Sequence, residues 1–126
     1  LCDVATFKNC VNLTSIVFED GGDVPLYVGG DLWLENTQVT ILVLPFKTYR
    51  IRGYWRRGSN LNTLYVKSTI PPILEHGWGD NPDTCDLYVP IGCKEVYASA
   101  TNWGSFRTIT EYDFDLNPNN VHYQSE

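Results

Sequence analysis

Five short apolar strings with one shared pattern recur along this 126-residue chain. Each string carries its main apolar positions first, fourth and sixth, as in L-x-x-L-x-L. The strings occupy residues 13–18, 39–44, 61–66, 84–89 and 106–111. Their central residues are Ile16, Leu42, Leu64, Leu87 and Ile109, at intervals of 26, 22, 23 and 22 residues. A constant period in the low twenties predicts a stacked repeat array in which each repeat adds one short strand.

Two further rows of side chains are in phase with the strings. Six residues before the successive strings stand Phe7, Trp33, Trp55, Trp78 and Ala100, the last of which precedes Trp103 by three residues. Ten residues before the later strings stand Ile51, Leu74 and Val96. We expect both rows to face inward, the first as a stack of aromatic rings. The alternative, a platform on which a ligand stacks, is disfavoured because the phase matches that of the core leucines.

The period and its L-x-x-L-x-L core predict an α/β-type leucine-rich repeat solenoid. We expect one curved sheet of short parallel strands, mostly irregular convex turns and a short C-terminal capping helix within residues 94–100, where Val96, Tyr97 and Ala100 have helical spacing. Glu111 replaces the last apolar residue of the fifth string, which indicates the end of the array because an inward carboxylate would be costly. We assign residues 1–112 to the repeat domain with its cap and residues 113–126 to an irregular tail.

The longest interval, between the first two strings, contains two pairs of glycines. Gly21 and Gly22 precede residues 24–28, and Gly29 and Gly30 follow them. This composition predicts an inserted loop or an extra strand-like segment.

Several segments resemble one known family. Residues 5–16, ATFKNCVNLTSI, are similar to the phrase A-F-x-x-C-x-x-L-T-S-I that repeats through BspA-type leucine-rich repeat proteins of anaerobic bacteria. Residues 61–72 resemble their penultimate repeat, and residues 87–90 with Val96, Tyr97 and residues 103–109 resemble their closing segment. The resemblance implies the C-terminal repeats of a secreted or cell-surface protein without enzymatic activity, associated in some members with adhesion. Tryptophan replaces the usual phenylalanine in three repeats and the second repeat is enlarged, so no binding residue is carried over.

Motifs for catalysis, cofactors and metals are missing from the sequence. The histidines are His76 and His122, and the chain has no nucleophile elbow, P-loop, G-x-G-x-x-G or C-x-x-C. We therefore expect no enzyme, no cofactor and no metal site. Residues 20–23 and 80–83 gather oxygen ligands that could hold calcium, but their glycine, asparagine and proline are typical of turns.

The four cysteines leave two alternatives open. Cys85 could pair with Cys93, and Cys2 with Cys10, since export permits disulfides. Separations of eight residues on a nearly extended path favour unpaired, buried thiols instead.

Charge is divided unevenly along the chain, whose net charge is −6. The stretch between Glu35 and Glu75 has no acidic residue and six basic ones, which leaves −12 for the remainder. Within it we predict a solvent-facing basic patch on the convex turn of the third repeat, made of Arg50, Arg52, Arg56 and Arg57. The acidic flanks argue against nucleic acid. The alternatives left for the patch are attraction between adjacent repeats, simple solvation, or an anionic partner such as an acidic glycan or a carboxylate-rich protein loop.

Alternation along the strands predicts which side chains leave the core. We expect an exposed apolar stripe on the concave sheet, made of Val17, Ile41, Val43, Tyr65 and Tyr88. The predicted function is a non-enzymatic protein-interaction or adhesion module that binds a protein partner on this sheet. The alternative is a carbohydrate-binding module that uses exposed aromatics and the basic patch, for which a groove with converging polar groups would be required. No apolar run is long enough for a membrane helix, so we expect no membrane insertion.

Overall fold

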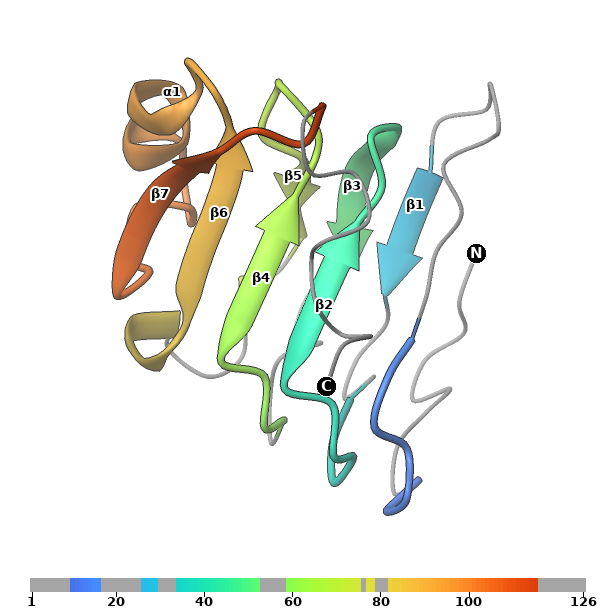
Figure 1. Ribbon diagram of the computed structural model, residues 1–126. Helices are drawn as coiled ribbons and strands as arrows, with labels where there is room; N and C mark the ends of the chain where they lie inside the picture. The colour runs from blue at the N-terminus through green and yellow to red at the C-terminus, as the bar shows by residue number, and fades with distance from the viewer. Residues whose placement is uncertain are drawn as a thin grey trace.

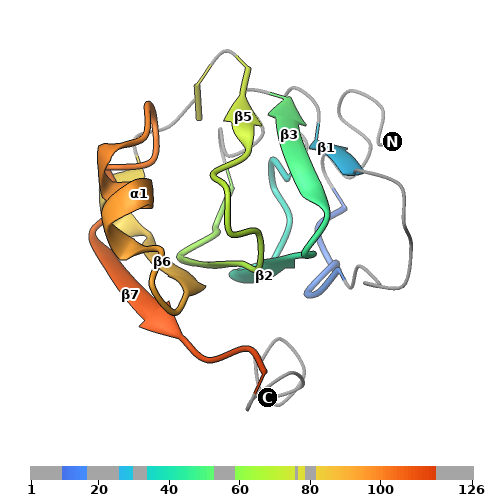
Figure 2. The same cartoon turned by 90° about the horizontal axis from the view of Figure 1, so that it is seen from above.

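The computed structural model contains two parallel β-sheets, and it describes residues 10–16, 26–29, 34–52, 59–75, 77–78 and 82–115. The four-stranded sheet has the order β2 (Ile41–Leu44), β4 (Thr63–Val66), β6 (Asp86–Pro90), β7 (Thr108–Tyr112). The three-stranded sheet has the order β1 (Leu26–Gly29), β3 (Thr48–Arg52), β5 (Ile73–Leu74). From β1 to β6 the chain alternates between the sheets, which face each other across the core (Figures 1 and 2). Short parallel strands with few helices, the general part of the fold prediction, are thus confirmed.

The second sheet corrects the expectation of one sheet with irregular turns on its other side. Ile51 of β3 pairs in register with Leu74 of β5, and both side chains are buried. Inward apolar residues that recur once in each repeat lie beside one another in successive repeats. Their backbones then lie about 4.8 Å apart, the distance between hydrogen-bonded strands, and can pair as a second sheet. The strand-like alternative for the glycine-flanked segment is also correct, since β1 pairs with β3.

The four-stranded sheet has the register that the apolar strings predict. Leu42 pairs with Leu64, Leu64 with Leu87, and Leu87 with Ile109. The three leucines are buried, whereas Ile16 and Ile109 are partly buried and pack against the same core. Ile109 is less covered because β7 lies at the end of the strand order and has β6 on one side only in this sheet.

Trp78 is the one aromatic member of the predicted row that lies among the described residues, and it faces inward as expected. Trp78 is buried and meets Trp103 edge-on, with ring centroids 5.0 Å apart. Each indole N–H reaches a backbone carbonyl: Trp78 donates to Asn102 and Trp103 donates to Pro72. Phe7, Trp33 and Trp55 lie outside the described residues.

The 3₁₀ turn η1 (Pro82–Thr84) precedes β6. The helix α1 (Lys94–Ser99) follows β6 and contacts β6 and β7 (Figure 2). The helix was predicted, but the inward position of Val96 was wrong: Val96 is exposed and Tyr97 is buried. Successive residues on a helix project about 100° apart, so both cannot face the core. Glu111 is exposed, and its carboxylate accepts a hydrogen bond from the Lys94 N–H at 3.2 Å. It thereby supplies the cap that the N-cap residue of α1 lacks.

The described cysteines are free thiols. Cys85 and Cys93 are buried, as expected for unpaired residues of this type, whereas Cys10 is exposed rather than buried inside its turn. Cys2 lies outside the described residues.

Candidate interaction surface

The stripe predicted on the four-stranded sheet is not an exposed surface. Val43 is only 9% exposed, and Ile41, Tyr65 and Tyr88 are partly buried. Val17 lies outside the described residues. The prediction of an open apolar stripe is therefore wrong at Val43 and only partly met at the other three positions.

Aromatic contacts from Tyr112, the last residue of β7, and from Phe114 account for the partial burial of Tyr65 and Tyr88. The rings of Tyr112 and Phe114 meet the ring of Tyr65 edge-on, with centroid distances of 5.2 and 6.3 Å. Tyr65 also stacks on Tyr88, with ring centroids 4.6 Å apart. We term these four rings the outer aromatic cluster. Burial raises the pKa of Tyr65, and the neighbouring phenols of Tyr88 and Tyr112 raise that pKa further. Residues 113–115, assigned to the tail, thus contact the sheet, and the aromatic alternation of Tyr112 and Phe114 is the signal that could have shown it.

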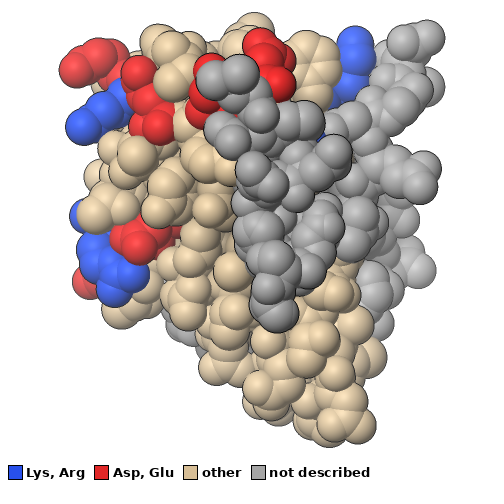
Figure 3. Space-filling model, in the orientation of Figure 1, with Lys and Arg blue, Asp and Glu red and all other residues tan. Residues whose placement is uncertain are grey.

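Exposed apolar side chains gather instead where β2, β4 and β6 end. Phe46, Ile70 and Ile91 follow these strands and are 54%, 78% and 62% exposed. Because the strands are parallel, their carboxyl ends meet at one edge, the top of Figure 1. We term this edge the carboxyl rim, defined by residues 45–48, 67–73 and 90–91. Figure 3 shows charged side chains gathered along the same upper edge, above a described sheet face that is mostly uncharged.

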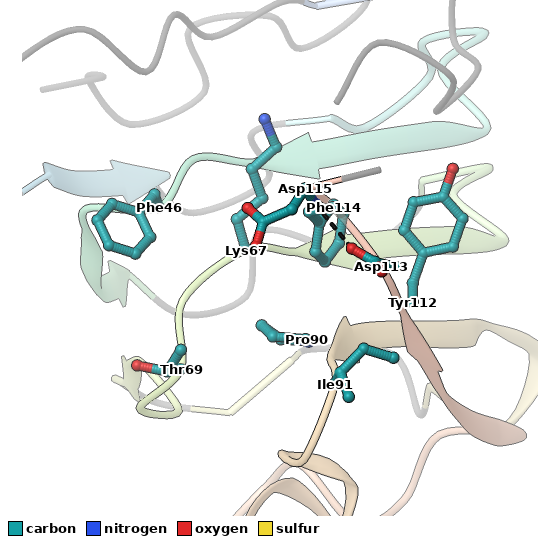
Figure 4. Close-up of a pocket in the computed structure, with 9 residues that line it drawn as sticks. All are labelled: Phe46, Lys67, Thr69, Pro90, Ile91, Tyr112, Asp113, Phe114 and Asp115. Carbon is teal, nitrogen blue, oxygen red and sulfur yellow. Dashed lines mark hydrogen bonds between the residues drawn. The ribbon is translucent and has the colours of Figure 1, made fainter. Parts of the chain in front are cut away.

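The larger of two hollows at the carboxyl rim has a volume of about 700 Å³. Rim residues and the segment after β7 line it together, and Figure 4 shows Phe46 on one side and Tyr112 on the other. The lining residues are Phe46, Lys67, Thr69, Pro90, Ile91, Tyr112, Asp113, Phe114 and Asp115. This hollow combines aromatic rings, two carboxylates, an ammonium group and a hydroxyl.

The smaller hollow, of about 400 Å³, adjoins the first because Phe46 and Thr69 line both. Its lining is mainly apolar, with Tyr49, Ile70, Pro71 and Ile73 beside Phe46. Lys47 belongs to this hollow, and its ammonium group lies 5.7 Å from the centre of the Phe46 ring. Both volumes fall in the range of ordinary ligand sites, about 300–1,000 Å³.

Buried hydrogen bonds hold the turns of the carboxyl rim together. The Ser68 hydroxyl donates to the carbonyl of Thr48 at 2.8 Å, and the Tyr97 hydroxyl donates to the carbonyl of Ser68 at 2.6 Å. Cys93 makes a weaker S–H contact with the Thr69 carbonyl. Burial raises the pKa of both Tyr97 and Cys93, so both stay neutral donors at neutral pH. The rim is therefore a preformed surface rather than a set of independent loops.

Of the four arginines predicted to form the basic patch, the structure describes the side chain of Arg50 alone. Arg50 is partly buried in β3, and its Nε lies 2.9 Å from a carboxylate oxygen of Glu75, as an ion pair rather than an aligned hydrogen bond. Its neutralised charge corrects the expectation of a fully solvent-facing Arg50. The side chain of Arg52, and Arg56 and Arg57 as a whole, lie outside the described residues.

The described segments lack two kinds of feature. They contain no group of three or more histidine, cysteine, aspartate or glutamate residues that could hold a metal ion, and none of their helices is long and apolar enough to cross a membrane. His76 and His122 lie outside these segments. Comparisons of the chain with protein-family models, with curated proteins and with solved structures give no significant match.

Proposed function

We propose that this chain is a non-enzymatic protein-interaction module of an exported, BspA-type bacterial leucine-rich repeat protein, secreted or held at the cell surface, and that it binds a protein partner at its carboxyl rim. The in-register leucines and the parallel strands support a repeat solenoid. The phrase A-F-x-x-C-x-x-L-T-S-I supports the family and, through it, the adhesive role.

The observation that carries the proposal is the exposure of Phe46, Ile70 and Ile91 along one edge, where Phe46 lines one hollow with Ile91 and an adjoining hollow with Ile70. Large apolar side chains that gather on a soluble surface are typical of contact sites, whereas scattered ones are not. Their turns are already fixed through Ser68 and Tyr97, so binding would cost little further ordering. The concave stripe is a weaker candidate because Val43 is covered.

Carbohydrate binding remains the second candidate, and the larger hollow favours it. An exposed ring, Phe46, stands there near the Thr69 hydroxyl and the carboxylates of Asp113 and Asp115. Sugars bind through such a combination of a ring face and converging polar groups. The predicted basic patch adds nothing to this candidate at Arg50, whose charge is paired with Glu75.

One pair of variants separates these functions. Ile70→Glu places a charge at the most exposed apolar residue of the rim, and Val11→Glu introduces the same charge at a 56% exposed valine of the segment 10–16. That segment hydrogen-bonds through Leu13 to Gln38, which precedes β2, so it lies toward the amino ends of the strands. Both variants and the parent chain are tested against a displayed random-peptide library and a glycan array.

We expect peptides, not glycans, to be retained, with affinity lowered about tenfold or more by Ile70→Glu and unchanged by Val11→Glu. Glycan binding without peptide binding would favour the carbohydrate module. Equal peptide binding by both variants would contradict the rim as the site.

A further inference from the structure

We infer that the carboxyl rim binds an extended peptide segment in which a lysine or arginine lies close to an apolar residue, the basic side chain entering the larger hollow and the apolar one the smaller. This inference rests on the proposed protein-binding function and specifies the chemistry of the partner.

Charge distinguishes the two hollows. The larger one has the carboxylates of Asp113 and Asp115 and the ammonium group of Lys67, which together give −1. The lining of the smaller one includes Lys47 and no acidic residue, which gives +1. A cationic side chain is therefore attracted to the larger hollow and repelled from the smaller one.

The two carboxylates are held on one short turn. The Asp115 N–H donates to Asp113 Oδ1 at 3.0 Å, so the chain folds back directly after the strand β7. The same segment is fixed to the sheet by Phe114, whose ring lies 5.0 Å from that of Tyr112. The negative charge of the larger hollow is thus placed by packing.

The apolar lining of the larger hollow suits the long stem of a basic side chain. Phe46, Tyr112 and Phe114 present ring surface, and lysine or arginine buries its methylenes against such surface while its charged end stays near water or carboxylates. A cation near an aromatic face gains further attraction, about 0.5–1 kcal/mol at exposed sites. An anionic glycan would meet the same carboxylates with repulsion.

The smaller hollow complements a second, apolar side chain. Phe46, Tyr49, Ile70 and Ile73 are all exposed around it, so an entering aliphatic or aromatic group would cover all four. Since Phe46 and Thr69 belong to both hollows, neighbouring side chains of one extended segment can occupy them together. Residues two apart on an extended chain project from the same side about 7 Å apart, which favours an i, i+2 spacing.

The test uses a fluorescent peptide with leucine and lysine at i and i+2 in a glycine–serine background. Three analogues replace the lysine by norleucine, the lysine by glutamate, or the leucine by glycine. The full chain is compared with the double variant Asp113→Asn/Asp115→Asn and with Asp83→Asn, a matched change at an exposed aspartate of η1. Circular dichroism and thermal unfolding confirm that the variants fold.

We expect the leucine–lysine peptide to bind best, more weakly at higher salt, and about tenfold more weakly to the double variant, with Asp83→Asn unchanged. The norleucine peptide should bind the parent and the double variant equally. Equal affinities for the lysine and glutamate peptides, or no effect of the double variant, would overturn the charge assignment. If the charge assignment failed but Ile70→Glu still abolished peptide binding, the proposed protein-binding function would stand without the charge assignment. If no peptide bound at all, the proposed function and the charge assignment would both be contradicted.

Discussion

The two faces of the four-stranded sheet are made by the same strands but are held in different ways. On the core face Leu42, Leu64 and Leu87 pair in register and are almost fully buried. On the outer face Tyr65 and Tyr88 stack on each other, and Tyr112 and Phe114 from the end of the described chain cover them. Repetition builds the core face, and a single non-repeating segment completes the outer one.

This difference assigns stability and recognition to different parts of the molecule. Burial of large aliphatic side chains contributes most to folding, since a fully buried leucine is worth about 1.5–3 kcal/mol of transfer free energy. Contacts between partly exposed rings contribute less, about 0.5–1.5 kcal/mol for each pair. The outer cluster and the hollow beside it can therefore vary without loss of the fold, which is what a binding surface requires.

The largest expected effect is at the centre of the core face. Leu64→Ala removes a side chain that is 1% exposed and packed between Leu42 and Leu87, so we expect the free energy of unfolding to fall by about 2–5 kcal/mol. Urea denaturation followed by circular dichroism measures the loss. A loss below about 1 kcal/mol would mean that the core does not depend on this register.

A smaller effect is expected where the cap joins the rim. Tyr97→Phe keeps the ring but removes the hydroxyl that donates to the buried carbonyl of Ser68, a loss of about 1–3 kcal/mol. Burial raises the pKa of Tyr97 above its ordinary value, so its contribution is complete below about pH 10 and is lost as pH rises from there toward the folded-state pKa.

Alkaline unfolding tests this coupling directly. The parent chain should lose stability above about pH 10 more steeply than Tyr97→Phe does, because the variant has no phenol to ionise at this position. Parallel alkaline profiles of the two proteins would show that Tyr97 does not contribute to the pH dependence.

On the outer face, Phe114→Ala should lower the free energy of unfolding by only about 0.5–1.5 kcal/mol, because it removes ring contacts with Tyr65 and Tyr112 without opening the core. The pKa of Tyr65 should fall toward the ordinary value, since burial is the main cause of its increase. Nuclear magnetic resonance titration of ¹³C-labelled tyrosines measures this pKa. An unchanged Tyr65 pKa would mean that Phe114 does not cover the outer face.

The sequence predicts contacts that repeat and misses those that occur once. Leu42, Leu64, Leu87 and Ile109 were placed correctly because one period aligns them in neighbouring strands. Val96 was misplaced because a repeat offset was applied inside a helix, where Tyr97 turns inward instead. The sequence predicts that Ile51 and Leu74 face inward, but it does not show that their backbones pair as strands. For this reason the second sheet was not predicted.

The candidate site was predicted less well for a related reason. Val43 pairs with Tyr65 and alternates outward as expected, but alternation along a strand does not reveal how far surrounding side chains bury a residue. The carboxyl rim depends on Phe46, Ile70 and Ile91, which follow their strands at unequal distances and so share no period. Arg50 meets Glu75 because β3 and β5 are neighbours. Attraction between adjacent repeats was one alternative for the basic residues, but the charge count alone does not choose it over solvation.

The smallest expected effect concerns a polar pair on the outer face. Arg107 donates to both carboxylate oxygens of Asp86, from Nε at 2.8 Å and from Nη2 at 2.9 Å, and the Thr108 hydroxyl donates to the same group. The hydrogen bonds from Arg107 are the main cause of a lowered pKa at Asp86. The Asp86 carboxylate therefore binds a proton more readily in the unfolded chain than in the folded one. The contribution of the pair to the free energy of unfolding is complete above about pH 4 and is lost as the pH falls below that value.

Arg107→Gln should bring the Asp86 pKa back toward its ordinary value and make the acid unfolding profile shallower below about pH 4. The variant should be slightly less stable than the parent at neutral pH, a small difference because the pair is exposed to solvent, and the difference should fade as the pH falls. Asp83→Asn serves as the control, since it changes one charge in η1 and leaves Arg107 and Asp86 in place. High salt should reduce the difference between parent and Arg107→Gln, because both partners are partly accessible to ions. If the two profiles coincided at low salt, the outer face would owe its order to the aromatic cluster alone, and the comparison between the faces would become one of leucine packing against ring packing.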